Sequence, residues 1–107
     1  MQNVVVLGST GSIGKSSIEV IKKNKDKFNI VCLVANSNEE LILAQSKRYK
    51  NSKIYLENPK RAKSSKKLIK KNELLELISS EEVDVVIAAI SGSDGLELVH
   101  HSIKNGK

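Results

Sequence analysis

The sequence has a single cysteine, a single proline, three aromatic residues and no long hydrophobic run. Cys32 cannot form an internal disulfide, so we expect it to be a small buried hydrophobic side chain in a reducing cytoplasm. The longest apolar run, 83–90, is interrupted by Asp84 and is too short to span a membrane. The chain does not start with a basic segment, and its apolar stretch 4–7 is too short for a signal peptide. These absences exclude a disulfide scaffold and a membrane span. A chain of 107 residues is long enough for one domain with a modest core.

Metal-ligating and catalytic side chains are also scarce. No Asp, Glu or His cluster has the spacing of a metal site, and His100 and His101 are adjacent on an expected helix, so they point in different directions. Tyr49 and Lys53 match the Y-x-x-x-K pair of short-chain dehydrogenases. In that family the pair lies far downstream, on a helix beside the nicotinamide, so we attribute this match to chance. We therefore predict no catalytic residue and no metal ligand in this sequence.

Basic residues are concentrated in the middle of the chain. The net charge is +6, and the segment 47–71 holds eleven Lys or Arg residues and one acid, Glu57. Such a run is typical of a nucleic-acid surface, and a basic nucleic-acid-binding module is one interpretation. The segment has no aromatic residue beyond Tyr49 and Tyr55 and no recognised nucleic-acid motif. We favour a solvated, lysine-rich face, whose charge would still attract a polyphosphate cofactor.

Three glycines at fixed spacing follow the first apolar stretch. Val4–Leu7 runs directly into Gly8, Gly11 and Gly14, and a helix is expected from Ser12. Glycine has no Cβ, so such a turn can be tight and its backbone can approach a diphosphate closely. The first N–H groups of the following helix lack helical partners and point toward an anion, together with the positive end of the helix dipole. The pattern therefore favours nucleotide binding over a turn that is merely structural.

The spacing distinguishes between glycine-loop chemistries. G-x-x-G-x-x-G is wider than the dinucleotide fingerprint G-x-G-x-x-G, although dinucleotide-binding proteins also use it. Gly14-Lys15-Ser16 matches the end of the NTPase phosphate loop, but Ser9 stands where that motif needs its first glycine. The apolar run 83–89 also does not end in the aspartate that would hold Mg²⁺ in an NTPase. We favour a dinucleotide site.

Apolar periodicity alternates between strand and helix along the chain. We expect strands near 3–7, 30–35, 53–56 and 83–90, and helices near 12–24, from 39 onward, 60–71, 73–80 and 96–104. This order predicts an α/β, Rossmann-like, doubly wound parallel sheet with strand order 3-2-1-4 and a ligand crevice at the carboxyl ends of strands one and four. The chain stops at Gly106-Lys107, where a next strand would start, so we expect a truncated domain.

Two of the expected helices carry specific assignments. In the first, Ile13, Ser17, Val20 and Ile21 are expected on one side. In the second, Asn38 is expected to be the N-cap, with acidic residues in the first turn and with Leu41, Ala44 and Tyr49 as the apolar set. A turn at 91–95 is expected to lead into the last helix.

The residue after the second strand decides between NAD and NADP in such folds. An NAD-specific domain usually has an acid there for the ribose 2′-hydroxyl. Here Asn36, Ser37 and Asn38 follow the strand, and the first carboxylate is Glu39. Without an acid, a 2′-phosphate meets no like-charge repulsion, and Ser37 and Asn38 can donate hydrogen bonds to it. This favours NADP.

At this point the sequence resembles a known family, the 1-deoxy-D-xylulose 5-phosphate reductoisomerases. The resemblance is carried by Leu7-Gly8-Ser9-Thr10-Gly11-Ser12-Ile13-Gly14, Ser16, Val20, Phe28, Val31, Leu33-Val34-Ala35, Asn38, Ala88-Ala89-Ile90, Gly92, Gly95-Leu96 and Gly106-Lys107. It covers the whole chain. It implies the N-terminal NADPH-binding domain of an oxidoreductase of isoprenoid biosynthesis, which isomerises 1-deoxy-D-xylulose 5-phosphate and reduces it with NADPH to 2-C-methyl-D-erythritol 4-phosphate, using Mg²⁺ or Mn²⁺.

The resemblance also implies residue roles. Thr10, Gly11, Ser12 and Ile13 would cradle the cofactor, Asn38 would lie at its adenosine end, and Ala88-Ala89-Ile90 would line the nicotinamide half of the crevice. From their place after the second strand, we also expect Asn36 and Ser37 to bind the cofactor. The family usually has Gly-Lys or Gly-Arg in place of Asn36-Ser37, so a cation for the 2′-phosphate is missing there. The metal ligands and the substrate-binding residues would lie beyond position 107, so this part alone is expected to be inactive.

The family is expected to be homodimeric and cytoplasmic, or plastidic in a eukaryote, with no membrane or nucleic-acid partner. Another NAD(P)-dependent reductase with the same glycine turn, such as a semialdehyde dehydrogenase, is the alternative within the enzyme class. The nucleic-acid module is the alternative outside it.

Overall fold

The computed structural model describes residues 1–90 and 96–107, and the turn expected at 91–95 lies outside the described residues. Its elements in chain order are β1 (Gln2–Leu7), α1 (Ser12–Lys23), β2 (Phe28–Ala35), α2 (Glu39–Ser46), β3 (Lys53–Leu56), the 3₁₀ helix η1 (Arg61–Ser64), α3 (Lys71–Ser79), β4 (Val85–Ala88) and α4 (Leu96–Lys104). In the described residues, no helix is both long and apolar enough to cross a membrane.

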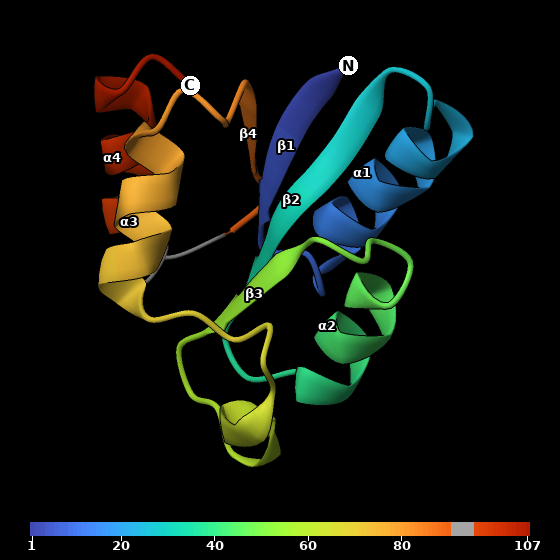
Figure 1. Cartoon of the computed structure of the whole chain (residues 1–107), viewed down its shortest axis with the longest axis vertical. Coiled ribbons are helices and arrows are strands. Elements are labelled where there is room, and N and C mark those ends of the chain that lie inside the picture. The colour runs from blue at the N-terminus through green and yellow to red at the C-terminus, as the bar shows by residue number, and fades with distance from the viewer. Residues whose placement is uncertain (91–95) are drawn as a thin grey trace.

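The four strands form one parallel sheet in the order β3-β2-β1-β4. Helices α1 and α2 lie on one side of the sheet and α3 and α4 on the other, so both faces are covered (Figure 1). This confirms the predicted doubly wound, Rossmann-like architecture and its strand order. All four strands end at the same edge, which we call the carboxyl edge.

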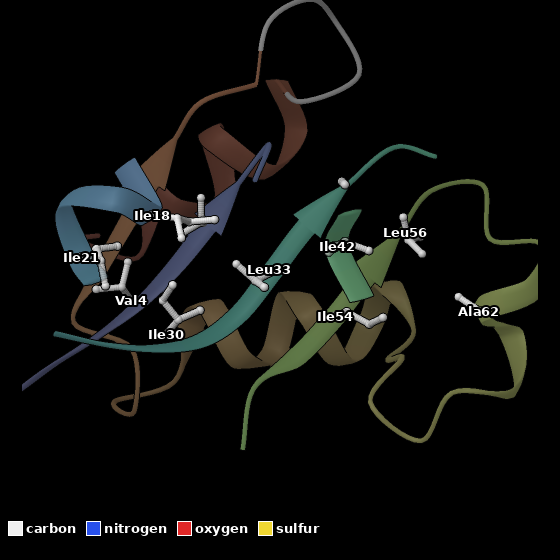
Figure 2. Close-up of a cluster of buried hydrophobic side chains, with 11 residues drawn as sticks. Val4, Ile18, Ile21, Ile30, Leu33, Ile42, Ile54, Leu56 and Ala62 are labelled. Atoms are coloured by element: carbon white, nitrogen blue, oxygen red, sulfur yellow. The ribbon is translucent and has the colours of Figure 1, made fainter. Parts of the chain in front are cut away.

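The core consists of two apolar clusters, one on each face of the sheet. The cluster under α1 and α2 includes Ile18, Leu33 and Ile42, and Figure 2 shows the side chains of this cluster spread along the sheet. The cluster under α3 and α4 includes Cys32, which is fully buried, as expected. Burial raises the pKa of its thiol to about 12, so this cysteine is an inert hydrophobic side chain.

A bulge in β2 changes which face of the sheet its side chains pack on. The register with β1 shifts between Val4 and Val5, and Val31 and Cys32 consequently both pack under α3 and α4. Residues on either side of the bulge alternate between the faces in the ordinary way. The continuous apolar run of this strand is therefore buried on both sides, as in other parallel sheets.

Helix α1 buries a different side from the predicted one. Gly14, Ile18 and Ile21 are buried, whereas Ile13 and Val20 are 67% and 58% exposed. The buried set has the helical spacing i, i+4, i+7, and it includes a glycine that lets the helix approach the sheet closely. Ile13, Ser17 and Val20 do line one side of α1, as predicted, but this side is exposed. The placement of Ile21 with them was wrong, because Ile21 lies on the buried side with Gly14 and Ile18.

The predicted helix over 60–71 is also wrong. The structure has η1 over four residues and then an extended stretch in which Leu68 forms a parallel bridge to Ile54. Ile54 N donates to Lys67 O (3.0 Å), and Ile69 N donates to Ile54 O (2.9 Å). The segment thus covers part of the open edge of β3, which satisfies backbone groups that a helix would leave exposed.

Two elements are also shorter than predicted. α2 ends at Ser46, so Tyr49 lies outside it. β4 spans Val85–Ala88, shorter than the predicted 83–90, because Asp84 instead bonds to Asn3 through its backbone N–H (2.9 Å to O) and its Oδ2 (2.8 Å from N). The strand β3 and the helix α4 have the predicted bounds.

Candidate functional site

The glycine turn between β1 and α1 is built by close backbone contacts. Gly8 has a φ of +84°, and a Cβ there would lie 2.6 Å from Ala89 O. A Cβ on Gly14 would lie 2.0 Å from Gly8 O, so the first turn of α1 packs directly on the end of β1. Both positions require glycine, one for its backbone conformation and contact with the segment after β4, the other for helix–strand contact.

Gly11 has no such internal reason to be glycine. Its φ of −81° and ψ of 173° suit any residue, and a Cβ would meet nothing closer than Gly8 O at 3.7 Å. It occupies the N-cap position of α1 and offers no side chain to the first amides of the helix. The space above Gly11 and the amides of the next turn are therefore available to an external anion.

A cleft of about 200 Å³ opens at the carboxyl edge beside this turn. It is lined by Gly8, Thr10, Gly11, Val34, Ala35, Asn36, Glu57, Ala89, Ile90 and Leu98. The lining comes from the glycine turn, the end of β2, the end of β3, the segment after β4 and α4. This is the place where doubly wound folds bind their ligands.

The structure brings some predicted site residues together and separates others. Thr10, Gly11 and Asn36 line the cleft. The side chains of Ser12 and Ile13 instead face a shallow depression on the outer side of α1. Only the backbone N–H groups of these two residues could therefore contact a ligand at the glycine turn. Of the three predicted residues 88–90, Ala89 and Ile90 line the cleft, whereas Ala88 is not part of its lining.

The other two adenosine-end residues lie on the loop between β2 and α2. Asn38 caps α2, because its Oδ1 accepts a hydrogen bond from Leu41 N at 3.3 Å. This is the predicted N-cap. Ser37 is exposed and uncharged, one residue from the cleft-lining Asn36. Neither residue lines the cleft itself.

Glu57 is a cleft residue that the sequence reasoning did not select. It follows β3 directly, and its backbone N–H donates to Ala35 O at 3.2 Å, which holds it beside the end of β2. Its Oε1 lies 3.8 Å from Lys71 Nζ, in a half-exposed ion pair. An acid is expected after β2 in such folds, whereas strand order 3-2-1-4 also brings the end of β3 to this edge of the sheet.

The glycine turn has a second anchor in α2. Gln45 Nε2 donates to Ser9 O at 2.9 Å. Ser9 itself is completely buried, and among the described residues neither its Oγ nor Gln45 Oε1 has a hydrogen-bond partner. The contact fixes the peptide that leads into Thr10 and Gly11.

The remaining sequence signals lie away from the cleft. Lys53 begins β3, at the end of that strand away from the cleft, and Tyr49 precedes it, so neither is a cleft residue. His101 Nε2 lies 3.0 Å from Leu75 O, between α4 and α3. In the part of the chain that the structure describes, no three His, Cys, Asp or Glu side chains gather closely enough to hold a metal ion.

The basic run 47–71 does not form one uniform surface. Lys67 Nζ donates to Ser46 O (2.7 Å) and Tyr49 O (3.0 Å), where it satisfies carbonyls at the end of α2. Lys71 pairs with Glu57 beside the cleft. The charges are therefore divided among helix capping, the cleft rim and solvent.

The parallel sheet, the strand–glycine turn–helix corner and the cleft at the carboxyl edge define the class of Rossmann-like domains. The sequence profile of the 1-deoxy-D-xylulose 5-phosphate reductoisomerase family matches residues 4–107. The chain belongs to this family, which confirms the resemblance described above.

Curated relatives share about a third of the residues. The reductoisomerase of Wigglesworthia glossinidia brevipalpis is 35% identical over 119 residues, and that of Thermodesulfovibrio yellowstonii is 35% identical over 114 residues. Each comparison covers 100% of this chain and 30% of the relative. The chain thus spans 30% of the length of these curated relatives.

Solved structures of reductoisomerases share the fold of this chain. A crystal structure of DOX-P reductoisomerase in complex with NADPH, fosmidomycin and magnesium matches with a TM-score of 0.84 and 28% identity, over 100% of this chain and 29% of that chain. The Zymomonas mobilis reductoisomerase in complex with NADPH matches with a TM-score of 0.69 and 26% identity, over 99% of this chain and 30% of that chain.

Proposed function

We propose that this chain is the NADPH-binding part of a 1-deoxy-D-xylulose 5-phosphate reductoisomerase. The proposed parent reaction isomerises 1-deoxy-D-xylulose 5-phosphate and reduces it to 2-C-methyl-D-erythritol 4-phosphate. NADPH supplies the hydride when bound, and Mg²⁺ or Mn²⁺ would act through residues outside these 107 positions. Family membership and the NADPH and magnesium named for related crystal structures support this proposal.

The observation that carries the proposal is that the three glycines are required for different reasons. Gly8 and Gly14 are required by contacts inside the domain, whereas Gly11 faces open space at the start of α1. A glycine that packing does not require, placed at a helix N-terminus beside a cleft, fits the approach of a diphosphate. Thr10 and Asn36 supply polar groups along the same cleft.

The two ends of the cleft differ in chemistry. Ala89 and Ile90 give an apolar wall near the glycine turn, which suits the flat nicotinamide half of the cofactor. Asn36 and Glu57 give a polar wall near the ends of β2 and β3, which suits ribose hydroxyls and a base edge. In this arrangement the chain binds and orients the cofactor, and other parts of the enzyme would hold the substrate.

The test is a titration of the chain with NADPH, followed by cofactor fluorescence, and a parallel titration with a mixed-sequence oligonucleotide. We expect saturable NADPH binding. Gly11→Val should weaken it at least tenfold, because the side chain occupies the space of the diphosphate. The matched control is Val20→Ala, an exposed α1 residue away from the cleft, which should bind NADPH like the parent.

Oligonucleotide binding without NADPH binding would instead support the nucleic-acid alternative. Undiminished NADPH binding by a folded Gly11→Val variant would show that the cradle lies elsewhere. Circular dichroism on each variant distinguishes loss of the site from loss of the fold.

A further inference from the structure

Glu39, the first residue of α2, directs its carboxylate toward a neighbouring loop. Its Oε2 accepts from Arg61 N at 3.0 Å, and its Oε1 accepts from Ala62 N at 3.3 Å and also from Lys60 N. Three backbone amides thus converge on one side chain. The pKa of Glu39 is held below its usual range, above all by the hydrogen bond from the Lys60 amide. The other two amides and the charge of Arg61 lower it further.

The loop that Glu39 holds runs alongside the residues after β2. Asn58 N donates to Asn36 O at 2.9 Å, and Asn58 Nδ2 donates to Asn36 Oδ1 at 2.7 Å. Four residues later, Ala62 is 2% exposed and packs in the core cluster under α1 and α2, as Figure 2 shows. The segment 58–62 is therefore fixed at both ends against the β2–α2 loop.

This attachment places two cations at a defined position. Lys60 and Arg61 are both exposed, and their backbones bond to the first residue of α2. The loop lies beyond the carboxyl ends of β2 and β3 (Figure 1), on the side of the cleft where Asn36 and Glu57 stand. Residues 36–38 themselves carry no charge.

We propose that Lys60 and Arg61, held beside the start of α2 by Glu39, supply the positive charge for the 2′-phosphate of NADPH. The inference rests on the proposed function and adds the source of its NADP selectivity. A 2′-phosphate on the adenosine ribose would lie over residues 36–38. Glu39 acts as a positioning residue, because it contacts the loop and not the cofactor.

Three other cations of the basic run have contacts or positions that differ from those of Lys60 and Arg61. Lys67 donates to carbonyls at the end of α2, and Lys71 pairs with Glu57. Lys53 is the first residue of β3, at the end of that strand away from the cleft. Lys60 and Arg61 are singled out by their backbone N–H groups, which are bonded to the first residue of α2 next to the uncharged residues 36–38.

The experiment compares NADPH and NADH dissociation constants for the chain and for a Lys60→Ala/Arg61→Ala double variant. NADH lacks the 2′-phosphate, so it reports every other contact. We expect NADPH to bind about three- to tenfold more weakly to the double variant, with NADH binding unchanged, because exposed cations beside a dianion attract it across solvent. The difference should shrink as the salt concentration rises.

The matched control is Lys25→Ala/Lys27→Ala. It removes the same charge from the exposed loop before β2, at the other edge of the sheet. A general electrostatic attraction would make both double variants lose NADPH affinity equally, and this would overturn the inference. An unchanged ratio of NADPH to NADH affinity in the Lys60→Ala/Arg61→Ala variant would overturn it as well.

Glu39→Ala tests the positioning role through the sign of its effect. If Glu39 only repelled the phosphate, its removal would raise the NADPH preference over NADH. If it anchors the cationic loop, its removal should lower that preference toward the value of the Lys60→Ala/Arg61→Ala variant. Failure of the parent chain to bind either cofactor would contradict the proposed function itself, which separates the two failures.

Discussion

Gly14→Ala is the change whose cost can be worked out most directly from the structure. The added Cβ would lie 2.0 Å from Gly8 O and 2.8 Å from both Gly8 C and Ser9 Cα. All three are backbone atoms of the glycine turn. Hydrogen bonds hold this turn in place, because Gly8 N and Ser9 N both donate to Val34 O, at 2.8 and 3.0 Å. The turn or the helix must move by about 1 Å or more to reach ordinary contact distance.

Overpacking of this kind costs about 1–3 kcal/mol, and more where backbone must move. Alanine in a helix returns about 0.5–1 kcal/mol relative to glycine, so it offsets only part of this cost. We expect a net loss of about 1–2 kcal/mol in the free energy of unfolding. For a domain of this size, that lowers the unfolding temperature by roughly 5–15 °C.

The assay is thermal and urea unfolding followed by circular dichroism. The matched variant is Gly11→Ala, whose Cβ meets nothing closer than 3.7 Å and whose backbone conformation suits alanine. It should unfold within about 0.5 kcal/mol of the parent. If Gly14→Ala unfolds at the parent temperature, or if both variants lose the same stability, the division of roles among the glycines is wrong.

Four further predictions concern cofactor choice, pH and turnover. Ser37→Lys should tighten NADPH roughly tenfold and leave NADH unchanged in parallel titrations, because it adds a charge-assisted contact of roughly 1–3 kcal/mol to the 2′-phosphate; equal gains for both would contradict this placement. Glu57→Gln should raise the NADPH-to-NADH affinity ratio a few-fold, since it removes a negative charge from the cleft, and a lowered ratio would refute that reading. The folded-state pKa of Glu39 is lowered, so its stabilising contribution is present above the unfolded-state pKa and is lost as pH falls through the folded-state pKa. The free energy of unfolding of Glu39→Gln, measured in urea across that pH range, should therefore depend less on acid than that of the parent. The 107-residue chain with 1-deoxy-D-xylulose 5-phosphate and Mg²⁺ should not oxidise NADPH, measured by absorbance, because the resemblance places the substrate and metal ligands elsewhere; metal-dependent turnover would overturn that assignment.

The strands and the glycine turn were predictable because their signals are local. β3 has the predicted bounds, and the continuous apolar run of β2 indicated a strand buried on both faces. The glycine spacing identified the strand–turn–helix corner. Strand order followed from the right-handed crossovers that alternating strands and helices require.

The errors arose where long-range contacts decide between local alternatives. Residues 60–71 have helix-compatible side chains, but the free edge of β3 and the carboxylate of Glu39 bind their backbone instead. The buried side of α1 depends on contact between Gly14 and Gly8, which no apolar pattern records. Glu57 was not predicted as a cleft residue, because its position depends on β2 and β3 being neighbours in the sheet.

The most direct test of the central claim is an amide chemical-shift titration of the labelled chain with NADPH. The account predicts the largest changes at residues 8–13, at Asn36 and at Ala89, with smaller ones at Lys60 and Arg61 that NADH does not reproduce. Absence of any change, or changes confined to the outer side of α1 or to residues 47–53, would contradict a cofactor site at the carboxyl edge.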